Sequence, residues 1–531
     1  MNSFKPMLLT SLKSYDRAQF AKDVTAGIIV AIIALPLSIA LALASGVGPE
    51  AGIFTAIVAG FVISALGGSC VQIAGPTAAF ATIVAGIVAR DGLEGLMTAT
   101  ILAGVFLIIM GFCHFGSLIK FIPYTITTGF TSGIAVTIVI GQLKDFCGVT
   151  YPDGVKPIET MEKLKAFAEN FSTISPDALI VGGVSLAILI VSPLIFKRIP
   201  GSLIAVIVGI LMVQFLPLHV STIGNLYTIS NALPTLHLPV FDMKLIQSAI
   251  PNAFTIAVLA AIESLLSCVV ADGMINSKHR SDTELIAQGA GNIASALFGG
   301  IPATGAIART AANIKNGGRT PVAGIVHSIT LVIVLVVLMP FAGMIPMPTI
   351  AAILFLVAYN MCQWRTFVHL VRTAPKSDII VLFTTFVLTV VFDLVVAIEI
   401  GMVLACLLFI KRMSEETHAD SWVYVDDDSP AVDEHLQKLP LEIRVYEITG
   451  PLFFGAADAI EHIVVKDFTK CLVLRMRSVP AIDSTAMNAL QNLTKLCESK
   501  GITLVFSHVN EQPMKVMKKS GFVELVGEEN F

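Results

Sequence analysis

Apolar stretches alternate with short polar stretches along most of the chain, from about residue 25 to about residue 410. Each stretch is close to the roughly 20 apolar residues that an α-helix needs to cross a bilayer. The pattern predicts an α-helical membrane protein with fourteen transmembrane segments, two of them interrupted by Gly and Pro. We place the segments near residues 24–45, 50–67, 70–90, 95–115, 118–143, 177–196, 201–218, 249–272, 284–300, 301–316, 321–346, 349–364, 377–393 and 394–412.

Lys and Arg residues are unevenly divided between the two sides of these segments. Of the 23 that precede Met413, sixteen lie at the N-terminus, in the even-numbered loops and after the last segment, and six lie in odd-numbered loops. Positive residues near the ends of transmembrane helices collect on the cytoplasmic side. We therefore expect a multi-pass protein of the cell inner (cytoplasmic) membrane, with both termini in the cytoplasm.

The composition changes abruptly after Arg412. Residues 414–437 are acidic and turn-prone, and we expect a solvated linker there. From residue 438 the pattern predicts strands over 443–449, 471–476 and 502–507, alternating with helices over 456–464, 484–499 and 511–519. We expect three parts: a transmembrane domain over 1–413, in which the halves 1–218 and 240–413 repeat one another, then the linker, then a small α/β domain over 438–531.

Composition excludes several classes of function. The 531 residues are 55% hydrophobic and 14% charged, and the net charge of -4 argues against nucleic acid as a partner. The eight cysteines are scattered singly without a CxxC pair, so no zinc or other metal site is expected. The chain has no GxxxxGK[ST] phosphate loop and no convincing Ser/His/Asp spacing. We expect no cofactor and no catalytic residue, hence no enzyme.

Two of the segments are broken at matching places. Residues 74–78 read Ala-Gly-Pro-Thr-Ala, and residues 302–306 read Pro-Ala-Thr-Gly-Ala. An offset of 227 residues maps Thr77 onto Thr304 and Pro36 onto Glu263, and lays the apolar run 95–115 over 322–342. The shared offset indicates an internal duplication. Paired Gly/Pro-interrupted segments in corresponding halves indicate the binding site of a secondary transporter.

The two breaks predict an anion site. In each broken segment an extended part precedes a helix, which we expect to begin near Thr77 and near Thr304, about halfway across the membrane. Helix N-termini carry unpaired N–H groups and roughly half a positive charge. Two such ends that approach each other near the membrane midplane attract an anion.

Three polar residues in the same region add to this hypothesis. Arg309 places a full charge inside the tenth segment, at a cost of roughly 2.5–3.5 kcal/mol unless it is paired or hydrated. Glu263 and Ser267 lie one turn apart on one face of the eighth segment. Glu263 can serve as a proton carrier. Two interpretations stay open: Glu263 and Arg309 act directly in transport, or they neutralise each other as a structural ion pair.

Several motifs occur in order along the chain. They are Pro36 followed by residues 45–49 (SGVGP), 67–69 (GGS), 74–77 (AGPT), 261–266 (AIESLL), 289–292 (GAGN) and 308–310 (ART). With these motifs the chain resembles the sulfate permease (SulP) family of anion transporters over nearly its whole length. Its C-terminal part, with residues 482–485 (IDST) between a strand and a helix, is similar to the STAS domain.

The resemblance implies two inverted seven-helix repeats, divided into a core domain (segments 1–4 and 8–11) that moves like an elevator against a gate domain (segments 5–7 and 12–14). It also implies a homodimer with cytoplasmic STAS domains, which leave room for an unidentified cytoplasmic partner. By position, the family's anion pocket maps onto Leu41, Thr77, Ala78, Gly305, Ala306 and Arg309, and its coupling-ion site onto Glu263, Ser267 and Thr304. One departure is Leu37, where many members have Gln, and this puts a sulfate-type polar pocket in question.

The resulting hypothesis is a proton-coupled symporter of a dicarboxylate or a small inorganic anion such as sulfate or bicarbonate, working in membrane lipid. The Pro-Leu pair with an Ile-Glu-Ser-Leu-Leu run looks nearest the bacterial C4-dicarboxylate branch. Sodium-coupled transport of bicarbonate or sulfate and anion exchange are alternatives. A nucleobase permease is a more remote one, against which Arg309 and the STAS tail count. A sensor anchored by the membrane part is a third reading, for which fourteen segments are excessive.

Overall fold

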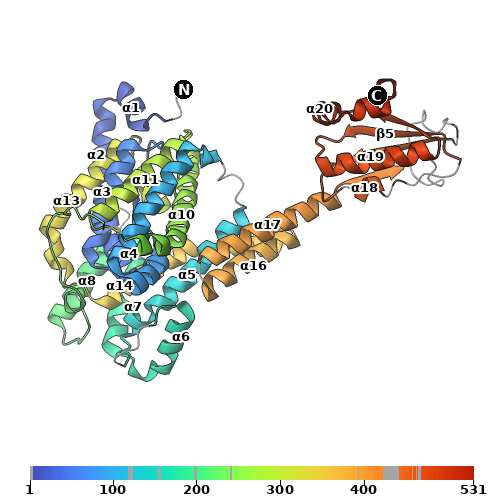
Figure 1. Cartoon of the computed structure of the whole chain (residues 1–531). Helices are drawn as coiled ribbons and strands as arrows, with labels where there is room; N and C mark the ends of the chain where they lie inside the picture. The colour runs from blue at the N-terminus through green and yellow to red at the C-terminus, as the bar shows by residue number, and fades with distance from the viewer. Residues whose placement is uncertain are drawn as a thin grey trace. The chain divides into compact units, whose positions relative to one another are not determined.

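The computed structural model of the chain describes residues 4–117, 123–152, 157–195, 200–239, 242–392, 394–421, 440, 442–456, 458–461, 463 and 468–531. It divides into two compact units, Met1–Met402 and Val403–Phe531. The first unit is built largely of helical elements, many of which carry labels in Figure 1, and the last of them, α17, continues past Met402. They are α1 (Met7–Ser11), α2 (Arg17–Ala44), α3 (Pro49–Leu66), β1 (Ala74–Gly75), α4 (Ala78–Phe112), α5 (Tyr124–Cys147), α6 (Thr160–Glu169), α7 (Pro176–Ile195), α8 (Gly201–Phe215), α9 (Ile223–Leu226), α10 (Met243–Ile275), α11 (Ser281–Leu297), β2 (Thr304–Gly305), α12 (Ile307–Lys315), α13 (Val322–Ala342), α14 (Met347–Cys362), α15 (Trp364–Thr373), α16 (Lys376–Val391) and α17 (Leu394–Glu415).

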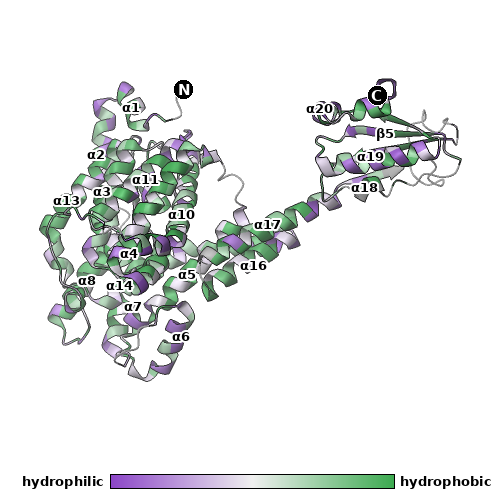
Figure 2. Ribbon diagram, viewed as in Figure 1, coloured by the Kyte–Doolittle hydropathy of each residue, from purple (hydrophilic) through white to green (hydrophobic). Residues whose placement is uncertain are grey.

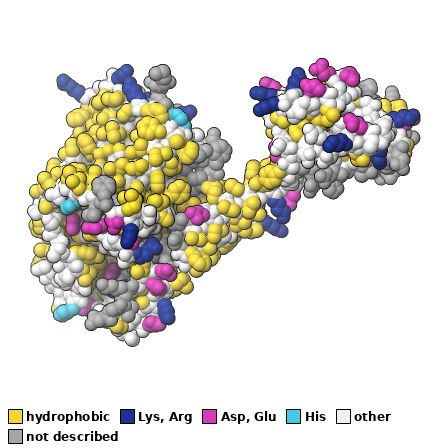
Figure 3. All heavy atoms as spheres, in the orientation of Figure 1, with side chains coloured by type: hydrophobic (Ala, Val, Ile, Leu, Met, Phe, Trp, Pro, Cys, Tyr) yellow, Lys and Arg dark blue, Asp and Glu magenta, His cyan; other side chains and the backbone are white. Residues whose placement is uncertain are grey.

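These helices account for the fourteen predicted segments. Eight helices among the described residues are long and apolar enough to cross a membrane by themselves. One of them, α4, holds two segments, because Gly92 breaks it with a φ of 69° and a ψ of -168°, a conformation that glycine adopts readily. The shorter α8, α11, α12 and α16, together with α17, supply the rest. Figure 2 shows that apolar residues dominate these helices, and Figure 3 shows that apolar side chains cover much of the visible face of the unit.

The helices pack as two groups. In one group α4 contacts α10 and α11, α13 contacts α2 and α3, and α3 contacts α11. In the other, α5 contacts α14 and α16, and α7 contacts α8 and α14. The groups are the expected core (segments 1–4 and 8–11) and gate (segments 5–7 and 12–14), each drawn from both repeats. Close crossing of α4 and α11 depends on Gly104 and Gly289, because a Cβ on either would overlap the carbonyl oxygen of the other.

The two broken segments meet in the core group. Strand β1 pairs antiparallel with β2, with Ala74 opposite Gly305 and Gly75 opposite Thr304. This two-residue ladder satisfies backbone groups where neither segment is helical, as irregular backbone at membrane depth requires. The ladder also sets the two following helix starts beside each other.

The second unit contains a four-stranded sheet in the order β3-β4-β5-β6. Its elements are β3 (His418–Ser421), β4 (Ile443–Thr449), α18 (Asp458–Glu461), β5 (Cys471–Ser478), α19 (Ser484–Ser499), β6 (Thr503–Ser507), α20 (Glu511–Lys519) and α21 (Phe522–Val526). β4, β5 and β6 run parallel, whereas β3 is antiparallel to β4. Every second residue in the middle of β5 is buried, and these side chains face α19 in one apolar core.

The predicted strands and the two long helices of this unit are present within a residue or two. Two features differ from the prediction. The first part of the expected linker has regular secondary structure, since α17 continues to Glu415 and residues 418–421 form β3; residues 422–437 lie outside the described part. The helix expected over 456–464 is seen as Asp458–Glu461, and residues 457, 462 and 464 of it are not described.

Candidate functional site

The two helix starts at the breaks are close together and uncapped. Helix α4 begins at Ala78 after Thr77, and α12 begins at Ile307 after Ala306. Neither start has a side-chain cap, so the backbone N–H groups of each first turn remain available to a hydrogen-bond acceptor beyond the N-terminus of the helix. The backbone N–H of Ala306 donates to the carbonyl oxygen of Ile73 at 2.9 Å, which ties the second start to the first break.

The expectation that the tenth segment becomes helical near Thr304 was wrong by three residues. Thr304 is in the β-ladder opposite Gly75, and its backbone is therefore extended. A two-fold symmetric ladder makes Ala74 equivalent to Thr304 and Gly75 equivalent to Gly305, an offset of 230 residues. Helix α13 spans Val322–Ala342 as expected, but the part of α4 that follows Gly92 ends at Phe112, so these two helix ends also differ by 230 residues. The structural repeat therefore has an offset of 230 rather than 227, and Thr77 and Thr304 are not structural equivalents.

Thr77 and Glu263 form the first polar contact of the site. The Thr77 hydroxyl donates to Oε2 of Glu263 at 3.0 Å, joining the start of α4 to α10. Both side chains are half-buried. Ile307 and Ala308, in the first turn of α12, have exposed side chains. The start of α12 is therefore not fully enclosed by the described part of the chain, whereas Ala78 and Ala79 at the start of α4 are buried.

Three further hydrogen bonds tie α10 to the second break and to α12, and all are buried. The Ser264 hydroxyl lies 2.8 Å from the Thr304 hydroxyl and accepts a hydrogen bond from the Gly305 N–H at 3.0 Å. One turn along, the Ser267 hydroxyl donates to Thr310 Oγ1 at 3.4 Å. Thr310 also accepts from the backbone N–H of Ile73 at 3.1 Å. These hydroxyl groups hold α10, α12 and the ladder together.

Arg309 is the buried cation of the site. Its side chain is 2% exposed, and Nη2 donates to the carbonyl oxygen of Pro76 at 2.9 Å. Nε and Nη1 are buried without a hydrogen-bond partner. Arg309 and Glu263 do not form an ion pair within 4.0 Å, so the structural ion pair considered above is not present. A buried guanidinium with two free donors leaves an uncompensated positive charge.

The guanidinium reaches the first break because Gly75 has no side chain. A Cβ at this position would overlap Nη1 of Arg309. The remaining predicted pocket residues supply surface rather than polar groups: Leu41 on α2, Ala78 and Ala306 have buried side chains. The predicted residues of α4, α10 and α12 are thus joined by hydrogen bonds or adjacent backbone, whereas Leu41 contributes only an apolar side chain.

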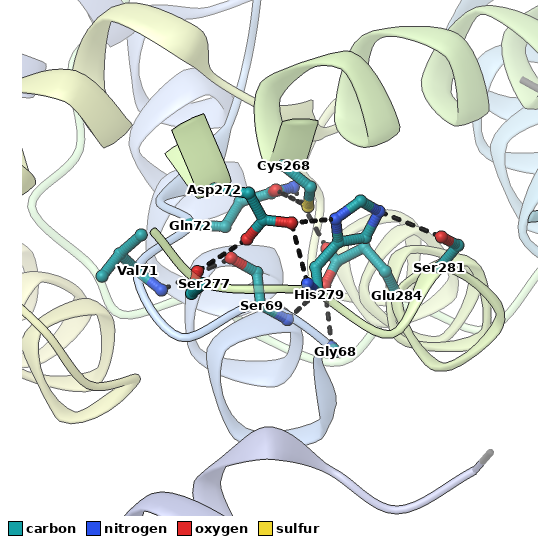
Figure 4. A network of polar contacts seen from close by, with 10 residues as sticks. All are labelled: Gly68, Ser69, Val71, Gln72, Cys268, Asp272, Ser277, His279, Ser281 and Glu284. Atoms are coloured by element: carbon teal, nitrogen blue, oxygen red, sulfur yellow. Dashed lines mark hydrogen bonds and ion pairs between the residues drawn. The ribbon is translucent and has the colours of Figure 1, made fainter. Parts of the chain in front are cut away.

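Sequence reasoning missed four polar residues around the breaks. Ser264 and Thr310 lie inside the quoted motifs, directly after Glu263 and Arg309. A hydroxyl residue next to a charged residue in an apolar segment was the signal that could have identified them as site residues. Gln72 and Glu284 were not considered, although Glu284 opens an otherwise apolar segment. Figure 4 shows both within a polar network of α10, α11 and the loop after α3. The described residues contain no group of three or more His, Cys, Asp or Glu side chains that could hold a metal ion.

Comparison with known proteins places these features in a family. The model of the sulfate permease family matches residues 20–385, and the model of the STAS domain matches residues 438–531. "Putative sulfate transporter YvdB" of Bacillus subtilis (strain 168) is 38% identical, covering 98% of this chain and 97% of the relative. "Bicarbonate transporter BicA" of Picosynechococcus sp. is 34% identical, covering 88% of this chain and 85% of the relative.

Solved structures share the fold. The overall structure of SLC26A9 superposes with a TM-score of 0.86 at 20% identity, covering 98% of this chain and 89% of that one. The transmembrane domain of the cyanobacterial bicarbonate transporter BicA superposes with a TM-score of 0.64 at 28% identity, covering 74% of this chain and 98% of that one. The fourteen-segment fold of two inverted repeats followed by a STAS domain is thereby confirmed.

Proposed function

The chain belongs to the sulfate permease family, a family of membrane transporters and not of enzymes, and from this premise we propose that it carries a small anion into the cell together with protons. The observation that carries the proposal is Arg309. Its guanidinium is buried with two unpartnered donors beside two uncapped helix starts. An anion with two or more oxygen atoms can accept from both the guanidinium and the backbone N–H groups.

The substrate class follows from this donor set. Planar or tetrahedral oxyanions suit a guanidinium fork, which binds two oxygen atoms at once. In Arg309 this fork is formed by Nη1 and the second N–H of Nη2, beside the N–H that Nη2 donates to Pro76. Sulfate, bicarbonate and dicarboxylates all meet this requirement. The named relatives are sulfate and bicarbonate transporters, and three of the predicted site residues, Leu41, Ala78 and Ala306, have apolar side chains. We therefore include succinate and fumarate, whose carbon chains tolerate an apolar wall.

Protons are the coupling ion that the side-chain contacts favour. A sodium ion needs several oxygen ligands, and the hydroxyl groups of Ser267 and Thr304 are already hydrogen-bonded to other hydroxyl groups in buried positions. The side chain of Glu263 is half-buried, and its carboxyl group accepts one hydrogen bond, from Thr77. This single hydrogen bond leaves oxygen lone pairs of the carboxyl group free to take up a proton.

The transport step in this proposal is an elevator movement of the core against the gate. Support comes from the composition of the site, because α4, α10 and α12 all belong to the core group and would move as one body. We further propose the inner membrane, cytoplasmic termini, a homodimer and a regulatory partner for the STAS domain. These rest on the distribution of Lys and Arg and on membership of the family.

Uptake into proteoliposomes tests the proposed function. The purified full-length chain is supplied with radiolabelled sulfate, bicarbonate, succinate or fumarate under an inward proton gradient, an inward sodium gradient, or neither. We expect concentrative uptake of at least one anion with the proton gradient alone. Uptake that responds only to sodium establishes the sodium-coupled alternative, and uptake that requires a preloaded counter-anion establishes exchange. Failure of every anion under every gradient rejects anion transport.

A further inference from the structure

Glu284 is a buried acidic residue that the proposed mechanism does not use. It lies in the first turn of α11 and is 1% exposed. Oε2 accepts hydrogen bonds from the backbone N–H groups of Gly68 at 2.9 Å and Ser69 at 3.2 Å. Oε1 accepts from the side-chain amides of Gln72 at 3.1 Å and Gln288 at 2.9 Å. Figure 4 shows this carboxyl group at the junction of α11 and the loop after α3.

All four partners of Glu284 are donors, which is the arrangement that a carboxylate requires. Glu284 takes part in none of the ion pairs of the described residues. A buried carboxyl group without a cation is costly unless hydrogen bonds compensate it. Apolar residues occupy most of the surrounding segment, so an acidic side chain at this position calls for a specific role.

Gln72 connects Glu284 to the anion site. Its Nε2 donates to Glu284, and its Oε1 accepts from the thiol of Cys268 on α10. The amide also lies directly against the backbone of β2, because a Cβ at Gly305 would overlap it. Gly305 is followed by Ala306 and then by the first turn of α12. The position of the Gln72 amide therefore limits where α12 can begin.

We infer that Glu284 is a positioning residue of the anion site: it orients the Gln72 amide against Gly305, and this contact places the start of α12 and the Arg309 guanidinium relative to α4. Glu284 contacts no substrate. Its effect passes through Gln72, so the two side chains form one unit. The inference builds on the proposed anion site, but the Glu284–Gln72 contact itself does not depend on which anion is carried.

Variants that exchange the amide of Gln72 and the carboxyl group of Glu284 test whether these two side chains form one unit. In Glu284→Gln, one amide oxygen can still accept from Gly68 and Ser69, but the new NH2 group faces the NH2 groups of Gln72 and Gln288. In Gln72→Glu, two carboxyl groups face each other. The double variant restores one donor and one acceptor between positions 72 and 284. We expect the KM for the transported anion to rise about tenfold or more in each single variant, with a smaller change in turnover, and to return to within about threefold of wild type in the double variant.

Asp272→Asn is the matched control. Asp272 belongs to the network of Figure 4, and its Oδ2 is hydrogen-bonded to Nδ1 of His279 at 2.7 Å, but no hydrogen bond joins it to Gln72. We expect its KM to stay near the wild-type value. A Glu284→Gln variant with unchanged KM, or a double variant no better than Gln72→Glu alone, overturns the inference.

A second measurement does not depend on transport. Cys268 is fully buried, and its thiol is hydrogen-bonded to Gln72. In a background with the other seven cysteines replaced by Ser, the rate of Cys268 alkylation by a small maleimide reports whether Gln72 stays in place. We expect alkylation about tenfold faster or more in each single variant and near the background rate in the double variant.

The two measurements separate the hypotheses. If no anion is carried by the wild-type chain, the proposed function fails, while the alkylation rates still test the Glu284–Gln72 unit. Equal alkylation rates in all variants overturn the inference even if transport is normal. Variants are compared only at matched elution from size-exclusion chromatography, and Gln72→Met, which keeps the length of the side chain but removes its amide, replaces any single variant that does not fold. It is expected to show the same increase in KM and in alkylation.

Discussion

Replacement of Arg309 by Gln is expected to weaken anion binding while it stabilises the empty protein. Arg309 is 2% exposed, and only Nη2 has a protein partner, the Pro76 carbonyl oxygen at 2.9 Å. Without an anion the charge is uncompensated, and by insertion scales a charged residue at this depth costs roughly 2.5–3.5 kcal/mol. Removal of the charge relieves much of this cost, so the thermal unfolding midpoint of the empty protein should rise.

The expected loss of affinity follows from two N–H groups on one edge of the guanidinium, one on the unpartnered Nη1 and the other the second N–H of Nη2. Hydrogen bonds to charged groups contribute about 1.5–3 kcal/mol each. At the lower value, loss of both removes about 3 kcal/mol, which raises Kd roughly 100-fold. Arg309→Lys keeps the charge but loses the planar fork, so its Kd should lie between those of the wild type and Arg309→Gln.

The assay is anion binding by titration calorimetry in detergent, combined with thermal unfolding with and without the anion. Arg365→Gln on α15 is the control, because Arg365 has an exposed side chain. The wild type should be stabilised by the anion, and Arg309→Gln should not be at the same concentration. A Kd for Arg309→Gln within threefold of the wild-type value, or a lower unfolding midpoint of its empty form, would refute the reasoning.

Three other predictions concern different parts of the chain. Glu263→Gln should abolish the acceleration of uptake by an inward proton gradient, whereas the control Glu399→Gln, at an exposed position of α17, should leave this acceleration intact. If uptake by Glu263→Gln still responds to the gradient as in the wild type, Glu263 is not the proton carrier. Gly75→Ala should reduce uptake about tenfold or more, because the new Cβ displaces the guanidinium of Arg309. The control Gly273→Ala, with open space at its Cβ, should be active, and equal uptake by the two variants would contradict the close contact between Gly75 and Arg309. Asp483→Ala should destabilise α19 by about 1 kcal/mol or more, because the Asp483 side chain accepts from two backbone N–H groups in the first turn of α19 at 2.9 Å. Amide hydrogen exchange measured on the full chain should then be faster in the first turn of α19, and exchange at the wild-type rate would exclude the helix cap.

The fold could be predicted from the sequence to a large extent because its signals are local. The length of an apolar stretch decides whether a helix crosses the membrane, and Gly92 marks the break between two segments in α4. Strand alternation gave β4, β5 and β6, because every second side chain faces the helices that cover the sheet. β3 was missed, since its four residues follow a helix and pair with a strand more than twenty residues away.

The candidate site could be predicted only as a set of residue types. The sequence indicated two broken segments, a buried cation and a nearby carboxyl group, and these are present. The sequence could not identify the hydrogen-bond partners of these residues. Glu263 contacts Thr77, a residue 186 positions away, rather than Arg309. Thr304 contacts Ser264 in the ladder rather than beginning a helix, so the sequence offset of 227 does not apply there.

The sequence by itself determined which stretches enter the membrane, where two of them are interrupted, and which charged residues are placed among them. Only the tertiary structure decided that Gln72 stands between Glu284 and Gly305, and that two nitrogen atoms of Arg309 lack partners. The physical reason is the separation along the chain of the residues that produce each feature. Hydrophobicity sums over about 20 consecutive residues and is visible in the chain, whereas a hydrogen bond requires two atoms within about 3 Å, and packing alone brings together groups that are hundreds of residues apart.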